Sequence, residues 1–311
     1  MTSYLIKRLL SALPTLFILS SLLFFLLRLA PGGPFDGERA FPAEVKAAID
    51  QRYGLDKPLT EQYQKWITHT LQGDLGESFQ YIGQPVVEII FESLPASITL
   101  GLFALFFAFI FGVTLGLVSA WKKGSLIDRL CMFISVSGVS LPGYLIASLL
   151  VIVFSLKLNW LPAALWEGPS SAVLPIITLA LRPLAMIARI TRASVIETLS
   201  SDYIRTAYAK GLHESQILLK HALKNGLIPL LTLIGPITAN LVTGSFLVEN
   251  VFQIPGMGKY FVSAILNRDY PVVMGVTLFY GFILIFCNLV SDVLCAWADP
   301  RIHYENEELE N

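Results

Sequence analysis

The sequence is poor in charged residues, which make up 14% of its 311 positions, whereas hydrophobic residues make up 54%. An average soluble domain carries about 25% charged residues. Five stretches contain no Asp, Glu, Lys or Arg, and a sixth contains only Arg182. These stretches are 9–27, 93–121, 130–156, 225–248, 270–291 and 168–188. Each has about the 20 residues that a helix needs to cross a bilayer. The composition therefore excludes a soluble enzyme and predicts an all-α polytopic membrane protein with six transmembrane helices.

The motifs of ATP hydrolysis and of metal chemistry are also missing. An ATP-hydrolysing chain carries a glycine-rich phosphate loop that ends in Gly-Lys-Ser/Thr, but the one Gly-Lys pair, Gly258-Lys259, is followed by Tyr260. The four histidines form no H-E-x-x-H motif and fall on both sides of the predicted membrane. The three cysteines lie inside predicted spans, where they act as small apolar residues. We therefore expect no catalytic residue, no metal and no cofactor in this chain.

Basic residues are scarce in the short connections on the side of the predicted membrane opposite the N-terminus. Twelve Lys and Arg residues lie on the side of the N-terminus, while the short opposite loops hold only Lys157, Lys259 and Arg268. The positive-inside rule then predicts that both termini are cytoplasmic. Since Lys and Arg total 22 against 23 Asp and Glu, no basic excess indicates nucleic acid.

The first outside loop, 31–92, is long enough to escape the positive-inside rule and carries ten acidic and five basic residues. Its pattern predicts a helix over 44–53 that follows Pro42 and ends at Gly54, and a second helix over 60–72 that ends at Gly73. A third helix is predicted over 86–93, with one apolar face on the membrane surface. This loop is either a packed cap or a receiving surface for another protein.

Small residues recur every four positions along the second predicted span, at Ala104, Ala108, Gly112, Gly116 and Ala120. This spacing lets two helix backbones approach closely in lipid. The stripe serves either static packing or a moving contact with another helix or subunit.

Four polar side chains inside predicted spans are candidates for a translocation path: Arg182, Asn240, Asn288 and Asp292. Arg182 lies seven residues before Arg189, which places it about 10 Å inside the cytoplasmic end of its helix. It either reaches back to the surface or faces a water-filled path. Asn288 and Asp292 share one helix face and serve either the path or hydrogen bonds between helices.

The cytoplasmic segment 189–224 carries six basic residues. Span four is predicted to continue to Leu199, and a short helix over 203–210 follows an N-cap in 200–202 and ends at Gly211. A further helix is predicted over 214–223. Such a short helix would expose Arg205, Ala207, Tyr208 and Lys210 for docking on another protein. The alternative is an ordinary basic loop.

The segment Arg205-Thr206-Ala207-x-x-x-Gly211 resembles the E-A-A-x-x-x-G loop of ABC importer membrane subunits, in the form typical of the dipeptide/oligopeptide/nickel family. Residues 31–39 and the overall length resemble the B-type permease subunit of the oligopeptide branch. Arg182 departs from what the family suggests. Further family-like segments lie at 28–32, 73–78, 188–192, 248–258, 267–270 and 299–302.

The resemblance implies a type I ABC importer transmembrane domain in the bacterial inner membrane. Its parts would be residues 1–93 as first span and outside loop, 94–298 as permease core with a coupling loop over 189–226, and 299–311 as cytoplasmic tail. The implied docking residues for an ATPase are Arg205, Thr206, Ala207, Lys210, Gly211, His213 and Glu214.

The implied partners are a second homologous permease in a heterodimer, two ATPase subunits that bind ATP and Mg, an extracytoplasmic peptide-binding protein, and membrane lipid. The outside segments 31–92 and 249–270 would receive the binding protein. Import of dipeptides, glutathione or nickel stays open within the family. An ion-coupled secondary transporter stays open outside it, although such a protein would show inverted repeats and paired membrane carboxylates.

Overall fold

The computed structural model describes residues 2–35 and 43–298, and within them the regular secondary structure is helical apart from one isolated β-bridge between Glu77 and Pro85. Pro42, part of segment 31–39 and the tail 299–311 lie outside the described residues. The helices are α1 Thr2–Leu29, α2 Ala43–Tyr53, α3 Leu59–Leu71, α4 Val86–Trp121, α5 Leu126–Ser140, α6 Gly143–Leu150, α7 Pro169–Leu199, α8 Asp202–Ala209, α9 Glu214–Gln216, α10 Leu223–Gly226, α11 Ile228–Val242, α12 Phe246–Val251, α13 Met257–Leu266 and α14 Tyr270–Ala298, with π-helical segments η1 Val151–Lys157 and η2 Ile217–Ala222.

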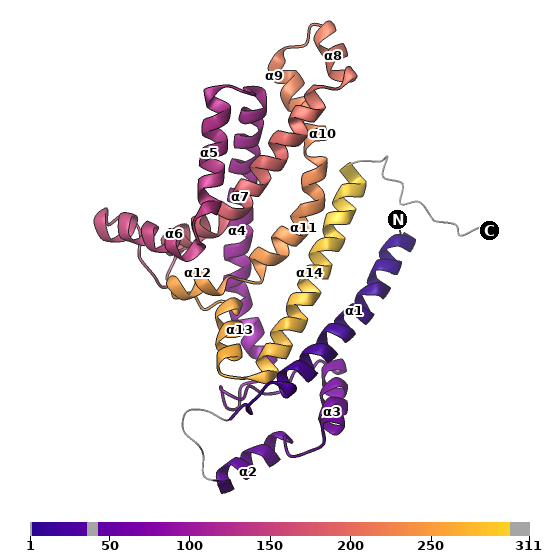
Figure 1. Cartoon of the computed structure of the whole chain (residues 1–311), viewed down its shortest axis with the longest axis vertical. Helices are drawn as coiled ribbons and strands as arrows, with labels where there is room; N and C mark the ends of the chain where they lie inside the picture. Colours follow the sequence, from indigo (N-terminus) through magenta and orange to yellow (C-terminus); the bar gives the residue numbers. More distant parts are fainter. Residues whose placement is uncertain (1, 36–42, 299–311) are drawn as a thin grey trace, which may run out of the picture.

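Five helical segments within the described residues are long and apolar enough to cross a membrane. They are Leu10–Leu29, α4, α7, Ile228–Val251 and α14. The third predicted span is broken, because α5 and the segment Gly143–Lys157 meet at an angle of 103°. The charge-free run 130–156 is therefore not one straight helix. Proline disfavours helical geometry at the preceding residue, and Leu141, which precedes Pro142, is extended. Six segments remain if the bent pair counts as one span, and Figure 1 shows α6 leaving α5 sideways.

The predicted surface helix over 86–93 is instead the first part of α4, which continues through Pro95 for 36 residues. The correction follows from what its apolar side chains contact. Ile89 and Ile90 are buried against α13 and α14, where they pack with Met257 and Val273. Ile89 and Ile90 are therefore buried inside the protein and not in the membrane surface, whereas Phe91 is exposed.

The small-residue stripe of α4 packs against α7 of the same chain (Figure 1). All five of its residues are buried. A Cβ atom added to Gly116 would lie 2.5 Å from the carbonyl oxygen of Ala188, so only glycine permits this approach. The stripe thus holds the two central helices of the core together.

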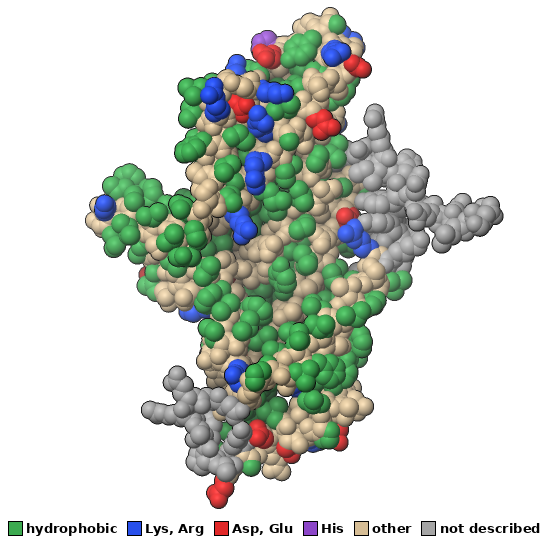
Figure 2. All heavy atoms as spheres, in the orientation of Figure 1, with side chains coloured by type: hydrophobic (Ala, Val, Ile, Leu, Met, Phe, Trp, Pro, Cys, Tyr) green, Lys and Arg blue, Asp and Glu red, His purple; other side chains and the backbone are tan. Residues whose placement is uncertain are grey.

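The two ends of the molecule differ in charge. Figure 2 shows Lys and Arg side chains over the end formed by α5, α7 and α8, and acidic side chains at the end that carries α2 and α3. This distribution places α8 on the cytoplasmic side and α2 outside, as the count of basic residues predicted.

Candidate functional site

Helix α8 is the predicted short helix of the cytoplasmic segment, and its bounds, Asp202–Ala209, differ from the prediction by one residue at each end. Helix α7 runs to Leu199, as expected. Gly211 ends α8 with a φ of +74°, in the left-handed region that favours glycine. Its N–H donates to the carbonyl of Tyr208 at 2.9 Å, and that of Leu212 donates to Ala207 at 3.3 Å. These bonds satisfy carbonyls that a helix end leaves open.

One face of α8 is buried within the chain. Ile204 and Ala207 are 0% and 7% exposed, and they pack with Ile217 and Leu218 of η2 and with Val195 of α7. The prediction that Ala207 is exposed was therefore wrong. Residues 204 and 207 share a helix face, and the larger Ile204 turns that face inward. Ala207 therefore helps to pack α8 against η2 and α7.

The exposed residues of α8 and of the turn that ends it include Arg205, Thr206, Tyr208, Lys210 and Gly211. We call these residues the docking face. Arg205 lies 3.5 Å from the carboxylate of Asp202 in an exposed pair, and the Thr206 hydroxyl donates to the Asp202 carbonyl. Neither contact covers the face, so its side chains are available to another protein.

His213 and Glu214 hold the segment that follows α8 in place. The Trp121 indole N–H, at the end of α4, donates to Glu214 at 2.7 Å. His213 Nδ1 lies 2.8 Å from the Ser215 hydroxyl at the start of α9. These two docking candidates therefore have contacts inside the chain, and no local pattern indicated the distant partner Trp121.

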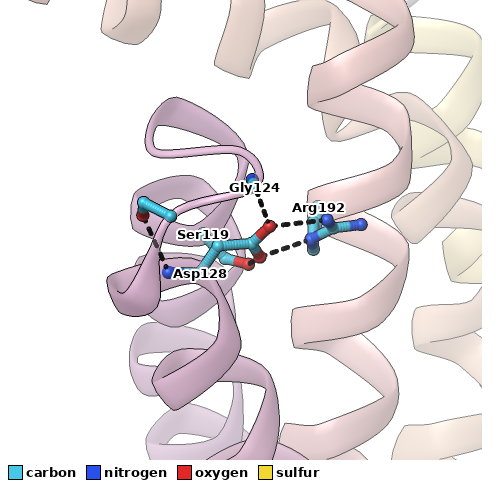
Figure 3. A network of polar contacts seen from close by, with 5 residues as sticks. Ser119, Gly124, Asp128 and Arg192 are labelled. Atoms are coloured by element: carbon cyan, nitrogen blue, oxygen red, sulfur yellow. Dashed lines mark hydrogen bonds and ion pairs between the residues drawn. The ribbon is translucent and has the colours of Figure 1, made fainter.

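A buried ion pair lies just inside this end of the core (Figure 3). Arg192 of α7 donates from Nε and Nη2 to the two carboxylate oxygens of Asp128, each at 2.8 Å. The Ser119 hydroxyl and the Gly124 N–H donate to the same carboxylate. The network joins the turn between α4 and α5 to α7. The sequence marked Arg192 only as part of segment 188–192 and did not indicate Asp128.

The four path candidates are in different surroundings. Arg182 is exposed at the middle of α7. Asn240 is exposed on α11, accepts a hydrogen bond from the Tyr280 hydroxyl at 3.2 Å, and lines a cavity of about 340 Å³ among α11, α13 and α14. Asn288 faces Gly235 of α11, and Asp292 forms an ion pair with Arg8 of α1. Arg182 and Asn240 are thus the exposed candidates, while Asn288 and Asp292 lie between helices.

Three family-like segments meet at the extracytoplasmic end. Asp269 is buried and accepts hydrogen bonds from the Ser78 hydroxyl and from the N–H groups of Phe79 and Gln80, the latter two at 3.1 and 3.3 Å. Arg268 donates to the Gly33 carbonyl at 3.3 Å. Segments around 28–33, 73–80 and 267–270 therefore form one unit, which their separation in sequence concealed.

The acidic residue Asp74 lies on the exposed rim of this unit. Its carboxylate contacts His69 Nδ1 at 2.8 Å and accepts from the Gly76 N–H at 2.9 Å. Both contacts favour the charged form and hold the pKa of Asp74 below its usual value. The pair links the end of α3 to segment 73–78.

Segment 248–258 folds around the carboxylate of Glu249, which is fully buried. The Ser97 hydroxyl of α4 donates to it at 3.0 Å, and the Lys259 N–H donates at 2.9 Å. A Cβ atom on Gly256 would lie 2.3 Å from Glu249 Cδ, so the glycines of this segment make room for the carboxylate. Glu249 thereby ties the α12–α13 turn to α4.

Within the described residues, no cluster of three or more His, Cys, Asp or Glu side chains could hold a metal ion. The polar groups of the site instead form hydrogen bonds and ion pairs between elements. What this geometry offers is an exposed short helix, rigidly attached at one end of a membrane-crossing core.

Comparison with protein families gives two matches that together cover most of the chain. Residues 112–304 match the family described as "Binding-protein-dependent transport system inner membrane component", and residues 1–101 match the N-terminal component of such systems. The family confirms the prediction of an inner-membrane transport component rather than an enzyme.

Curated relatives match over nearly the full length. The oligopeptide transport system permease protein OppB of Haemophilus influenzae is 46% identical, covering 98% of this chain and 100% of the relative. OppB of Escherichia coli K12 is 43% identical over the same shares, and the dipeptide transport system permease protein DppB of Lactococcus lactis is 43% identical over 97% and 99%.

A solved structure shares the fold. The MetNI methionine ABC transporter in an inward-facing conformation matches with a TM-score of 0.59 at 16% identity, covering 70% of this chain and 100% of that chain. This match supports the predicted type I ABC importer fold, with six spans when the bent pair counts as one. The chain belongs to the family of inner-membrane components of binding-protein-dependent transport systems.

Proposed function

We propose that this chain is one of two homologous permease subunits of an importer of oligopeptides, driven by two separate ATPase subunits and supplied by an extracytoplasmic peptide-binding protein. The docking face carries the proposal, because it is exposed beyond the core while the opposite face of α8 is buried in the chain. A helix held in this way can transmit force. ATP and Mg belong to the partner subunits.

Movement of the ATPases would be transmitted to the core through the contacts that hold the coupling loop, 189–226. When the two ATPase subunits close on ATP, their surfaces push α8, and η2 beneath it follows as one unit. The Trp121–Glu214 hydrogen bond conveys the push to α4, and the Asp128–Arg192 ion pair keeps α5 and α7 moving together. The cavity between the two permeases then opens outward, and ATP hydrolysis resets it.

Peptides are the proposed substrate because relatives named for oligopeptide and dipeptide transport match with similar identity, 46% and 43%. That similarity supports peptides as a class and does not separate long from short ones. Within the chain, we assign residues 1–93 to the first span and cap, 94–298 to the permease core, and 189–226 to the coupling loop. Segments 31–92 and 249–270 receive the binding protein.

The substitution Gly211→Asp tests the docking. No atom lies within 4 Å of a Cβ built on Gly211, so the added carboxylate meets only the partner. We expect peptide uptake and peptide-stimulated ATP hydrolysis in membrane vesicles to fall while the protein stays in the membrane. The matched control is Gly211→Ala, which imposes the same strain at a φ of +74° without adding a carboxylate and should keep normal uptake. Normal uptake by Gly211→Asp would contradict the docking.

A further inference from the structure

Two of the membrane-crossing helices have exposed faces without large apolar side chains. In α1, α4, α5 and α14, the exposed positions carry Leu, Ile, Val and Phe, as expected for contact with lipid. Along α7 beyond its first turn, the exposed residues are Arg182, Arg189, Ala193 and Glu197; along α11 they are Pro229, Thr232 and Asn240. These two faces are therefore suited to water or protein rather than to hydrocarbon.

Arg182 lies far from both ends of α7. Along the helix axis it is about 20 Å from Pro169, about 25 Å from Leu199 and about 10 Å from Arg189, the next charged residue, at 1.5 Å per residue. Figure 2 shows basic side chains over α7 that extend from its cytoplasmic end toward the middle of the molecule. An arginine facing hydrocarbon at such depth is costly, so it is expected to face a water-filled cavity or a partner group.

The direction of α7 disfavours the alternative in which Arg182 reaches back to the cytoplasmic surface. Side chains in a helix tilt toward its N-terminus, and the N-terminus of α7 is at the extracytoplasmic end. The Arg182 side chain therefore starts away from the cytoplasm. The Arg182 side chain makes no hydrogen bond or ion pair with any residue in 2–35 or 43–298, so its guanidinium has its donors available for a ligand.

We propose that Arg182 binds the C-terminal carboxylate of the peptide during translocation. This inference rests on the proposed import of peptides. Peptides differ in their side chains, but every unmodified peptide carries one C-terminal carboxylate. A guanidinium can hold a carboxylate with two parallel hydrogen bonds. A single fixed cation on a polar face can thus orient peptides of different sequence.

The first test measures whether water reaches Arg182. The native cysteines Cys131, Cys287 and Cys295 are replaced by alanine, and Arg182→Cys is introduced into the complete transporter in inside-out vesicles. We expect a membrane-impermeant, negatively charged thiol reagent to label this variant. Phe106→Cys, on the lipid-exposed side of α4, is the control that stays unlabelled. Absence of labelling at position 182, while Lys123→Cys in the exposed turn between α4 and α5 is labelled, would overturn the proposal.

The second test compares uptake of one peptide with a free C-terminal carboxylate and with a C-terminal amide. The peptide is chosen so that the isolated binding protein binds both forms, and both are supplied at saturation. With Arg182→Gln, we expect the acid-to-amide uptake ratio to fall about tenfold, as loss of a hydrogen bond to a charged group predicts. Arg182→Lys keeps the charge and should restore much of the ratio.

Arg189→Gln is the matched control, because it removes the same charge from the same exposed face of α7. We expect its acid-to-amide ratio to stay near that of the unsubstituted protein. An equal fall with Arg189→Gln, or an equal loss of both peptide forms with Arg182→Gln, would overturn the proposal while leaving peptide import intact. Uptake of neither form by the unsubstituted transporter would instead contradict the proposed function.

Discussion

The guanidinium of Arg192 forms two hydrogen bonds of 2.8 Å to the carboxylate of Asp128, and this ion pair joins α7 to the start of α5. The Asp128 side chain is 6% exposed and also accepts from Ser119 and Gly124. Seven residues further along, at Leu199, α7 ends and leads into α8. The pair is therefore placed to keep the cytoplasmic end of the core rigid when the ATPase subunits push on it.

Breaking this pair should destabilise the protein. Asp128→Asn and Arg192→Gln are each expected to cost about 3 kcal/mol, because each leaves a partly buried charge without its partner. The double variant should cost less than the sum of the two. Thermal unfolding of the purified transporter measures this. Arg189→Gln removes an exposed arginine from the same helix and is the control. Additive losses would contradict the coupling of the two residues.

The Trp121–Glu214 contact should matter for coupling more than for folding. Trp121→Phe and Glu214→Gln each weaken the hydrogen bond that attaches α9 to α4, which contributes roughly 1 kcal/mol. We expect peptide-stimulated ATP hydrolysis to fall several-fold in either variant, and no further in the double variant. Glu197→Gln, an exposed carboxylate on α7, is the control. A double variant that behaves as the product of the singles would argue against one shared contact.

The extracytoplasmic unit around Asp269 should loosen when its carboxylate is replaced. Asp269→Asn places an amide opposite three donors, from Ser78, Phe79 and Gln80, so at least one N–H loses its acceptor. We expect residues 73–81 to become sensitive to protease added to the outside of spheroplasts, and Ser78→Ala to have a smaller effect. Asp56→Asn, an exposed carboxylate between α2 and α3, is the control. Unchanged cleavage in Asp269→Asn would show that the carboxylate does not hold this segment.

The close approach of α4 to α7 should not tolerate one added methyl group. Gly116→Ala would place a Cβ atom 2.5 Å from a backbone oxygen of Ala188, which cannot move independently of α7. Overpacking of this kind typically costs about 1–3 kcal/mol. Gly143→Ala, where no atom lies within 4 Å, is the matched control. Equal thermal stability of the two variants would contradict the packing described here.

Helix ends that are set by a single glycine could be predicted from the sequence. The ends of α2 and α3 lie at Gly54 and Gly73, both at positive φ, and α8 ends at Gly211 for the same reason. Charge-free runs located the membrane-crossing segments, with the exception of the break at Pro142. There, a single residue with no backbone N–H bends the chain, and a count of apolar residues cannot detect it.

Contacts between distant segments were not predictable from one sequence. The apolar residues around Ile90 in the sequence are compatible with contact to lipid and with burial in protein. The position of α13 shows that Ile90 is buried in protein. Glu249 and Asp269 each accept hydrogen bonds from residues about 150 to 190 positions away. The exposure of Ala207 was mistaken because Ile204, one helical turn earlier, decides which face turns inward.

The docking of α8 on an ATPase subunit is tested most directly by a photo-crosslinking amino acid at Lys210, which is exposed on the docking face. The same probe at Lys157, in an outside connection, is the control. In the complete transporter, the probe at 210 should crosslink to an ATPase subunit and the probe at 157 should not. A transporter that imports peptide while the probe at 210 captures no ATPase would contradict the account.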